Sequence, residues 1–281
     1  MIAAASAREA LVAATDALAA AGVGSPRLDA ELLLAEATGD DRARLVADPE
    51  REVDAASARR FGAMVRRRLA REPVAYILGR KGFRHLELAV DGRALIPRPE
   101  TELLVEVALE LRPRTVLDVG TGSGALALAI AGELADASVT AVDTSADAIA
   151  VARSNAEALG LADRVTFDVV SSSLSMSVIS RQCDLVVANL PYVSEAEWEG
   201  LEPEITRWEP REALVAGPTG LEVIEGLLGE GAVGGGVGAI ALEVGAGQAL
   251  TVVELVRRAG FERAETRADL AGIERVVVGR R

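Results

Sequence analysis

The sequence has 281 residues and a mass of 29.2 kDa; half of its residues are apolar and only 3% are aromatic. This length fits one large domain or two ordinary ones, with a core that needs no disulfide or metal to hold it. The 30 basic and 43 acidic residues leave a net charge of −13, which argues against a nucleic-acid-binding surface. One cysteine and one histidine exclude a disulfide framework and a site rich in either residue, so we predict no bound metal.

The beginning of the chain predicts an amphipathic helix rather than a secretion signal, because Arg8, Glu9 and Asp16 interrupt its alanine-rich run. Its apolar stretches are shorter than the roughly 20 residues needed to cross a bilayer. The single Cys183 fits a reducing compartment. We therefore expect a soluble cytoplasmic protein with no membrane partner.

Apolar residues recur at helical spacing at the start of the chain, which predicts an all-helical domain over residues 1–75. Glycine and proline in residues 22–26 separate a first helix from a second, Gly39 ends the second, and Asp54 caps a third. One end of the third helix is basic, through Arg66, Arg67, Arg68 and Arg71. We interpret this basic end as a solvated helix face, with a partner-docking patch as the alternative.

A β-hairpin is predicted within residues 76–97, as the connection to a second domain. The run from Phe83 to Val90 alternates apolar and polar residues as a strand does, and Asp91-Gly92 supplies a hairpin turn. A helix is expected next, from about Thr101 to Leu111.

Strand, glycine turn and helix then alternate through residues 98–281, which predicts parallel β-α-β units with helices on both faces of the sheet. Right-handed crossovers make a Rossmann-like α/β arrangement the expected fold. The predicted strands are residues 115–119, 139–142, 165–170, 185–188, 239–243 and 275–278. The helices between them are expected to begin at Ala125, Ala146, Leu221 and Gln248.

A glycine-rich loop follows the first of these strands, and its glycines let the chain turn tightly and a ligand approach the backbone. Asp143 ends the next strand, where a carboxylate can accept hydrogen bonds from both ribose hydroxyls. With Ala125 the loop also satisfies a dinucleotide pattern, so NAD remains open. Asp118 and the acidic charge favour the ammonium and sulfonium groups of S-adenosylmethionine. The predicted cofactor-binding residues are Gly120, Thr121, Gly122, Ser123, Gly124, Asp143 and Asn189.

The tetrapeptide Asn189-Leu-Pro-Tyr192 follows a buried strand and should lie beside the glycine loop, since ligands bind at the carboxyl ends of strands. The Asn189 side-chain oxygen and the Leu190 carbonyl can accept both hydrogens of a planar NH₂ group. Pro191 holds Leu190 extended, and Tyr192 offers an aromatic face. Two such acceptors direct the nitrogen lone pair toward a methyl carbon, which predicts catalysis by orientation. We therefore predict Asn189, Leu190, Pro191 and Tyr192 as catalytic and substrate-binding residues.

These motifs resemble those of the peptide chain release factor N5-glutamine methyltransferases, which methylate the glutamine of the release factor Gly-Gly-Gln loop. The resemblance runs through residues 28–34, 73–79, 95–102, 116–124, 189–192 and 209–214. It implies a class I methyltransferase domain in which the glycine loop and Asp143 hold S-adenosylmethionine and the tetrapeptide holds the glutamine amide. It also implies that the helical domain helps to grip the release factor. Leu190 stands where the family usually has a proline, and no adenine contact is assigned in residues 171–174.

Two other functions remain open. The Asn-Leu-Pro-Tyr form is typical of ribosomal RNA adenine dimethyltransferases, and the adenine amine presents the same NH₂ geometry, so an adenine N6-methyltransferase of RNA or DNA is one alternative. It would need an electropositive surface, whereas the chain beyond residue 80 carries 18 basic and 31 acidic residues. A non-catalytic nucleotide-binding or NAD-dependent module is the other. We favour a monomeric release factor methyltransferase without direct nucleic-acid contact.

Overall fold

The computed structural model describes residues 6–170, 183–229 and 236–281. The chain divides into two compact units. A helical unit comprises Met1–Gly79 with Glu202–Trp208, and a sheet unit comprises Arg80–Leu201 with Glu209–Arg281. Within the described ranges, every helix is too short or too polar to span a membrane.

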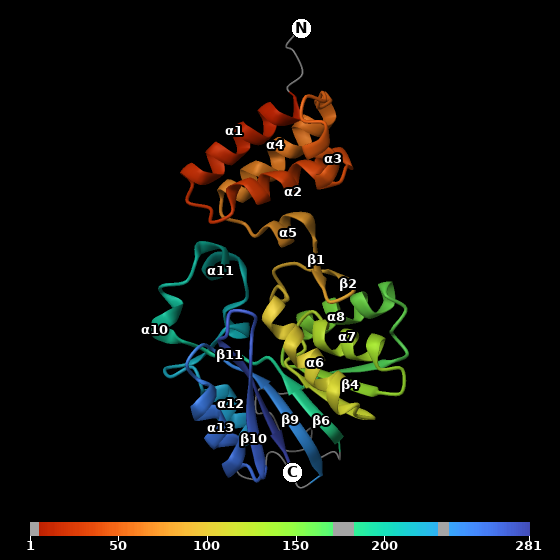
Figure 1. Ribbon diagram of the computed structural model, residues 1–281, viewed down its shortest axis with the longest axis vertical. Coiled ribbons are helices and arrows are strands. Elements are labelled where there is room, and N and C mark those ends of the chain that lie inside the picture. Colours follow the sequence, from red (N-terminus) through yellow and green to blue (C-terminus); the bar gives the residue numbers. More distant parts are fainter. Residues whose placement is uncertain (1–5, 171–182, 230–235) are drawn as a thin grey trace. The chain divides into compact units, whose positions relative to one another are not determined.

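Five helices form the N-terminal part of the helical unit (Figure 1). Ser6 and Glu9 cap the first of them reciprocally through side-chain to backbone hydrogen bonds. Gly39 ends the second in the left-handed region at φ 73°, and Asp54 caps the fourth by accepting from two backbone amides, as predicted for both residues. The helices are α1 (Ala7–Ala20), α2 (Pro26–Thr38), α3 (Arg42–Ala47), α4 (Ala55–Leu69) and α5 (Val74–Leu78).

The basic end of α4 is only in part the solvated face that the sequence predicts, because Arg66 and Arg67 are exposed but Arg68 and Arg71 are not. Arg68 is only 5% exposed, and its guanidinium lies 2.7 Å from both Asp29 and Glu204. Arg71 donates to the same Glu204 at 2.7 Å. The prediction is wrong for Arg68 and Arg71 because their acidic partners lie far away in the sequence, where no local pattern reveals them.

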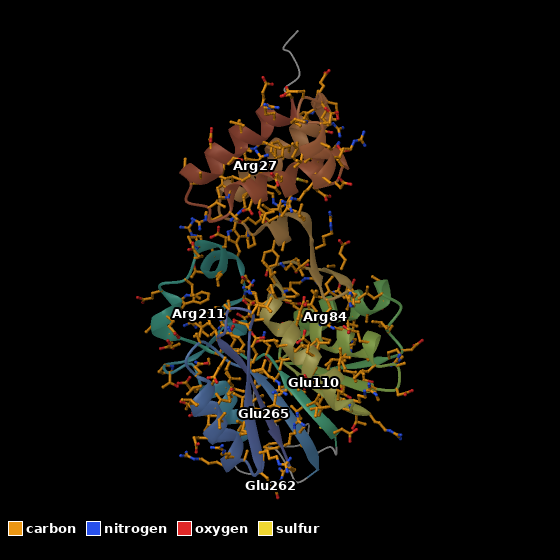
Figure 2. The ribbon with its side chains drawn as sticks, in the orientation of Figure 1. Arg27, Arg84, Glu110, Arg211, Glu262 and Glu265 are labelled. Carbon is orange, nitrogen blue, oxygen red and sulfur yellow. The ribbon has the colours of Figure 1, made fainter. Side chains whose placement is uncertain are left out.

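The predicted hairpin is present, but its turn lies elsewhere. Strands β1 (Arg80–Phe83) and β2 (Leu86–Ala89) pair antiparallel, so the run from Phe83 to Val90 is broken and Arg84-His85 forms the turn. Arg84, labelled in Figure 2, adopts φ 51°. Its contacts come from the sheet unit: its amide donates to Glu102, and its guanidinium pairs with Glu133 at 2.8 Å. A turn does follow Asp91, where the Ala94 amide donates to the Asp91 carbonyl at 3.2 Å, but the strand pair closes at Arg84-His85, so the prediction of Asp91-Gly92 as the hairpin turn is wrong.

A seven-stranded sheet forms the centre of the sheet unit, in the order β10-β11-β9-β6-β3-β4-β5. All six predicted strands are confirmed to within two residues, but β11 runs antiparallel to its neighbours. The sequence pattern does not predict β10, because this edge strand is largely polar and carries charged residues at alternate positions. The strands are β3 (Thr115–Val119), β4 (Ser138–Asp143), β5 (Val165–Val169), β6 (Cys183–Ala188), β9 (Val237–Glu243), β10 (Arg263–Ala268) and β11 (Glu274–Arg280).

Helices cover both faces of this sheet, as predicted (Figure 1). On one face, α6 (Glu102–Leu111), α7 (Ala125–Glu133) and α8 (Ala146–Ala158) pack against a core that includes Val116 and Leu185. On the other, α12 (Glu222–Leu228) and α13 (Ala249–Arg258) pack against Leu117 and Val186. Neighbouring residues of one strand therefore enter different cores, as the alternation of side chains along a strand requires.

Several short elements complete the chain. The turn η1 precedes α6, and the others follow the tetrapeptide Asn189-Leu-Pro-Tyr192. Residues 171–174, for which no adenine contact was assigned, lie outside the described residues. The short elements are η1 (Pro99–Thr101), β7 (Val193–Ser194), α10 (Glu195–Trp198), α11 (Pro203–Trp208), η2 (Arg211–Ala213) and β8 (Val215–Gly217), of which α11 belongs to the helical unit.

Candidate active site

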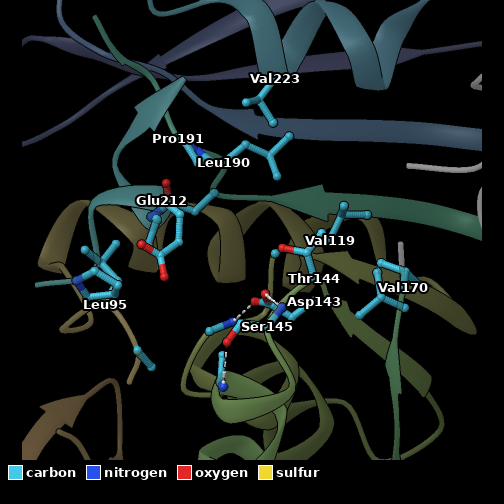
Figure 3. Close-up of a pocket in the computed structure, with 18 of the residues that line it drawn as sticks. Leu95, Val119, Asp143, Thr144, Ser145, Val170, Leu190, Pro191, Glu212 and Val223 are labelled. Atoms are coloured by element: carbon cyan, nitrogen blue, oxygen red, sulfur yellow. Dashed lines mark hydrogen bonds between the residues drawn. The ribbon is translucent and has the colours of Figure 1, made fainter. Parts of the chain in front are cut away.

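A cavity of about 260 Å³ opens at the carboxyl ends of β3, β4 and β6 in the sheet unit (Figure 3). This is the edge at which open α/β sheets bind their ligands. The cavity brings together six of the residues predicted from the sequence: Gly120, Gly122, Asp143, Asn189, Leu190 and Pro191. Its other walls come from the segments around Leu95 and Pro210 and from Val223 of α12.

The glycine loop is held against β4 by backbone hydrogen bonds. The amides of Gly120 and Thr121 donate to the Val142 carbonyl at 2.9 and 3.0 Å. Gly120, Gly122 and the last glycine of the loop all have φ between 57° and 84°, the left-handed region that glycine tolerates best. The sequence places glycine at each position where the turn requires it.

The glycines face different surroundings. A Cβ added at Gly120 would come within 3.1 Å of the Leu190 side chain, so the loop and the tetrapeptide are in close contact. At Gly124 it would meet Ala152 of α8 at 3.1 Å, so this glycine permits close helix packing. At Gly122 an added Cβ would meet no described atom within 4 Å, and this glycine lines the cavity.

Asp143 connects the end of β4 to the glycine loop. One carboxylate oxygen accepts from the Gly122 amide at 2.9 Å and the other from the Ser145 amide at 2.9 Å (Figure 3). Each oxygen keeps further lone-pair capacity on the cavity side. The carboxylate is therefore fixed in place and can still accept hydrogen bonds from a ligand.

The remaining predicted loop residues support the loop instead of lining the described cavity. The Thr121 hydroxyl donates to Asp118 at 2.7 Å, and burial raises the pKa of that carboxyl to about 7. The carbonyl of Ser123 accepts from the Asn155 side chain at 2.9 Å. Gly124 begins α7 as its N-cap. The described residues that line the cavity do not include Thr121, Ser123, Gly124 or Asp118.

The tetrapeptide lies directly after β6, with Leu190 buried in the core below the cavity. Tyr192 is absent from the described lining of the cavity and directs its hydroxyl to Glu243 at 3.3 Å. The Gln248 side chain donates to the Tyr192 carbonyl at 2.9 Å. Tyr192 is thus held at its ring end and at its backbone.

The Asn189 side chain belongs to a hydrogen-bond chain that sequence reasoning missed. Its Nδ2 donates to the Thr101 hydroxyl at 3.0 Å, and that hydroxyl donates to the second carboxylate oxygen of Glu243 at 2.6 Å. Because the amide nitrogen is engaged, the Asn189 Oδ1 is the atom left to face a ligand. A sequence signal did exist for Glu243: it is an acidic residue that ends an apolar strand at the ligand-binding edge.

Burial dominates the electrostatics of this chain of residues. Glu243 is 1% exposed, and burial raises the pKa of its carboxyl to about 7, against the opposing hydrogen bonds from Thr101 and Tyr192. Burial and the neighbouring Glu243 charge also raise the pKa of Tyr192 above its usual value. The phenol therefore stays protonated and acts as the donor.

Comparison with known proteins places this chain in a family. The model of the PrmC N-terminal domain matches residues 9–79, and that of the methyltransferase small domain matches residues 99–202. The release factor glutamine methyltransferase of Nitratidesulfovibrio vulgaris is 42% identical over 271 residues, which cover 94% of this chain and 91% of that protein. The chain belongs to the release factor glutamine methyltransferase family.

Another member, the release factor glutamine methyltransferase of Caulobacter vibrioides, is 39% identical over 96% of this chain and 95% of its own length. The resemblance drawn from the motifs is thereby confirmed, and the chain is a methyltransferase. A solved structure of the hMettl16 catalytic domain with the MAT2A 3′UTR hairpin 6 aligns at a TM-score of 0.54, covering 69% of this chain and 74% of that one. At 16% identity this likeness shows a shared fold alone.

Proposed function

We propose that this methyltransferase family member transfers a methyl group from S-adenosylmethionine to the side-chain amide nitrogen, N5, of the glutamine in the Gly-Gly-Gln loop of peptide chain release factors. The observation that carries the proposal is the orientation of Asn189. Its Nδ2 is bound to Thr101 at 3.0 Å, so its oxygen is presented where an amide NH₂ needs an acceptor. Its membership of the release factor glutamine methyltransferase family supports the same substrate.

The residues around the cavity fit the cofactor. At Gly122 the backbone is open to a ligand, since an added Cβ would meet no described atom within 4 Å. The Asp143 carboxylate, fixed by two backbone amides, would hold the ribose hydroxyls. Gly120 and Asn189 would border the reacting end. When bound, S-adenosylmethionine supplies an electrophilic methyl group on a sulfonium sulfur.

The chain's own residues orient the substrate nitrogen. An amide nitrogen is a weak nucleophile because its lone pair is delocalised into the carbonyl. The Asn189 Oδ1 and the Leu190 carbonyl each accept one of its hydrogens, which fixes the direction of the lone pair. Pro191 restricts the backbone of Leu190 and so aims that carbonyl. Leucine in place of the family's usual proline keeps the carbonyl, and its buried side chain anchors the segment against Gly120.

Tyr192 is proposed as the aromatic wall of the substrate amide. Its hydroxyl is bound to Glu243 and its carbonyl to Gln248, so its ring has a fixed position. The other predicted loop residues, Thr121, Ser123 and Gly124, act from behind the cofactor site. Their contacts hold the backbone that Gly120 and Gly122 present.

We propose residues 1–75 as the region that recognises the release factor, residues 76–97 as the connection and residues 98–281 as the catalytic domain. We also propose a monomer that acts in the cytoplasm without membrane contact. A protein substrate without direct nucleic-acid contact agrees with the net charge of −13. An adenine N6-methyltransferase would use the same NH₂ geometry, but this charge disfavours a polynucleotide substrate.

The test is to incubate the purified protein with S-adenosylmethionine carrying a labelled methyl group and with either a release factor or a structured RNA. We expect label on the release factor alone, at the glutamine of its Gly-Gly-Gln loop, when peptides are analysed by mass spectrometry. Label on adenine, or on another residue of the release factor, would contradict the proposed substrate.

A further inference from the structure

We infer that Thr101 and Glu243 are positioning residues that select which end of the Asn189 side-chain amide faces the substrate. This inference rests on the proposed function and adds two residues to it. Thr101 is the last residue of η1, and Glu243 is the last residue of β9. Both lie far in the sequence from the tetrapeptide that they orient.

The first step is the convergence of these groups at one edge of the sheet. The Glu243 carboxylate accepts from Thr101 through one oxygen at 2.6 Å and from Tyr192 through the other at 3.3 Å. The Thr101 hydroxyl in turn accepts from the Asn189 Nδ2 at 3.0 Å. A single buried carboxylate thus holds both ends of the tetrapeptide, Asn189 through Thr101 and Tyr192 directly.

The second step is the direction of the hydrogen bonds. When Glu243 is ionised, its carboxylate can only accept hydrogen bonds, so Thr101 must donate its single proton to Glu243. The hydroxyl oxygen then offers only a lone pair to Asn189, and only the NH₂ end of the amide can bind there. A flipped amide would place its oxygen against the Thr101 oxygen, which has no proton left to share, so this hydrogen bond would be lost.

The third step is burial. Thr101 is 5% exposed and Glu243 is 1% exposed, so water does not readily replace either partner. Hydrogen bonds shielded in this way hold their geometry more strictly than exposed ones. The contacts therefore keep the Oδ1 of Asn189 directed toward the substrate before the substrate arrives.

The experiment compares Thr101→Val, which removes the hydroxyl while keeping the shape, with Thr101→Ser, which keeps the hydroxyl. Thr266→Val is the matched control, because Thr266 donates an exposed 2.7 Å hydrogen bond to Glu274 within the β10–β11 pair. Measurements are kcat and KM with release factor, calorimetric affinity for S-adenosylmethionine, and thermal unfolding. If Thr101→Val does not fold, Thr101→Ala replaces it.

We expect Thr101→Val to lower kcat by about 10- to 100-fold, the scale of a misplaced catalytic group, with cofactor affinity changed less than about threefold. We expect Thr101→Ser and Thr266→Val to stay within about threefold of wild type. Full kcat in Thr101→Val, an equal loss in Thr101→Ser, or loss of cofactor binding with kcat would overturn the inference.

A readout independent of activity separates this inference from the proposed function. In NMR spectra, the Asn189 side-chain NH₂ protons should exchange with water more slowly in the wild type than in Thr101→Val. Equal exchange would contradict the positioning role whatever the substrate. A wild-type protein that shows this protection but leaves release factor unmethylated would instead refute the proposed function.

Discussion

The amide of Gly122 donates to the Asp143 carboxylate at 2.9 Å, so the glycine loop after β3 is tied to the end of the neighbouring strand β4. This bond brings together the two cofactor-binding signals of the sequence, which are 21 residues apart. It also fixes one carboxylate oxygen while the other is held by Ser145. The cofactor site is therefore preorganised by backbone hydrogen bonds.

Replacing Asp143 with alanine should weaken S-adenosylmethionine binding by more than tenfold, because the hydrogen bonds to a charged acceptor are lost at about 1.5–3 kcal/mol each. Asp184→Ala is the matched control, since Asp184 also accepts from two backbone amides, those of Arg114 and Thr115, beside the opposite ends of the strands. Calorimetric titration should show weak binding for Asp143→Ala alone. Similar affinities for the two variants would remove Asp143 from the site.

Gly120→Ala should destabilise the protein more than Gly122→Ala, even without cofactor. Both residues have positive φ, but only at Gly120 would the new Cβ press on the tetrapeptide, at 3.1 Å from Leu190. We expect the free energy of unfolding to fall by about 1–3 kcal/mol for Gly120→Ala and by about 1 kcal/mol for Gly122→Ala. Denaturant unfolding of both proteins measures the difference, and equal losses would argue against close contact between loop and tetrapeptide.

Arg68→Ala should cost about 3–5 kcal/mol of stability, because it leaves the buried Asp29 carboxylate without its ionic partner, whereas Glu204 keeps its ion pair with Arg71. Arg66, on the same helix and exposed, supplies the control, and its alanine variant should change stability by less than about 0.5 kcal/mol. Unfolding of the full-length protein distinguishes the two. A mild effect of Arg68→Ala would mean that these ion pairs contribute little.

Activity should rise with pH through about 7, the raised pKa of Glu243. Below it the carboxyl is protonated, carries a donor of its own and no longer fixes the direction of the Thr101 hydrogen bond. Charged neighbours, Glu100 and Arg275, shift this pKa in opposite directions. The measurement is kcat between pH 5.5 and 8.5 at saturating substrates. Glu243→Gln, which cannot ionise, should lose this rise, and an unchanged profile in that variant would assign the rise to another group.

The same carboxyl has the opposite effect on stability. A folded-state pKa of about 7, above the ordinary value of 4.5, means that the protonated form is favoured on folding. The contribution of this carboxyl to the free energy of unfolding is complete below pH 4.5 and is lost as the pH rises through about 7. The free energy of unfolding of the wild type, relative to Glu243→Gln, should therefore fall across this range.

Local signals predicted most of the sheet unit. The apolar runs of β3 and β6, the glycines after β3 and the tetrapeptide after β6 each lie within a few residues, so one short window contains the information. The polar edge strand β10 has no apolar run to detect. The hairpin turn at Arg84 depends on Glu102 and Glu133, which no nearby pattern specifies.

Some residues of the candidate site could be predicted from the sequence, and others could not. Asn189 and Asp143 follow strands, and the rule that ligands bind at strand ends identifies them. Thr101 and Glu243 act on Asn189 from 88 positions before it and 54 after it, so only the folded chain brings them together. In the helical unit, the buried ion pair of Arg68 with Asp29 joins residues 39 positions apart, although the sequence around Arg68 has the pattern of an exposed basic helix.

The central claim is that the oxygen of Asn189 orients the substrate nitrogen. The most direct test is the single-turnover rate of methyl transfer to release factor by Asn189→Ala, with S-adenosylmethionine affinity measured on the same protein. We predict a fall of at least 100-fold, about 3 kcal/mol in the barrier as for other positioned acceptors and donors, with the cofactor still bound. A rate within a few-fold of wild type would contradict the claim.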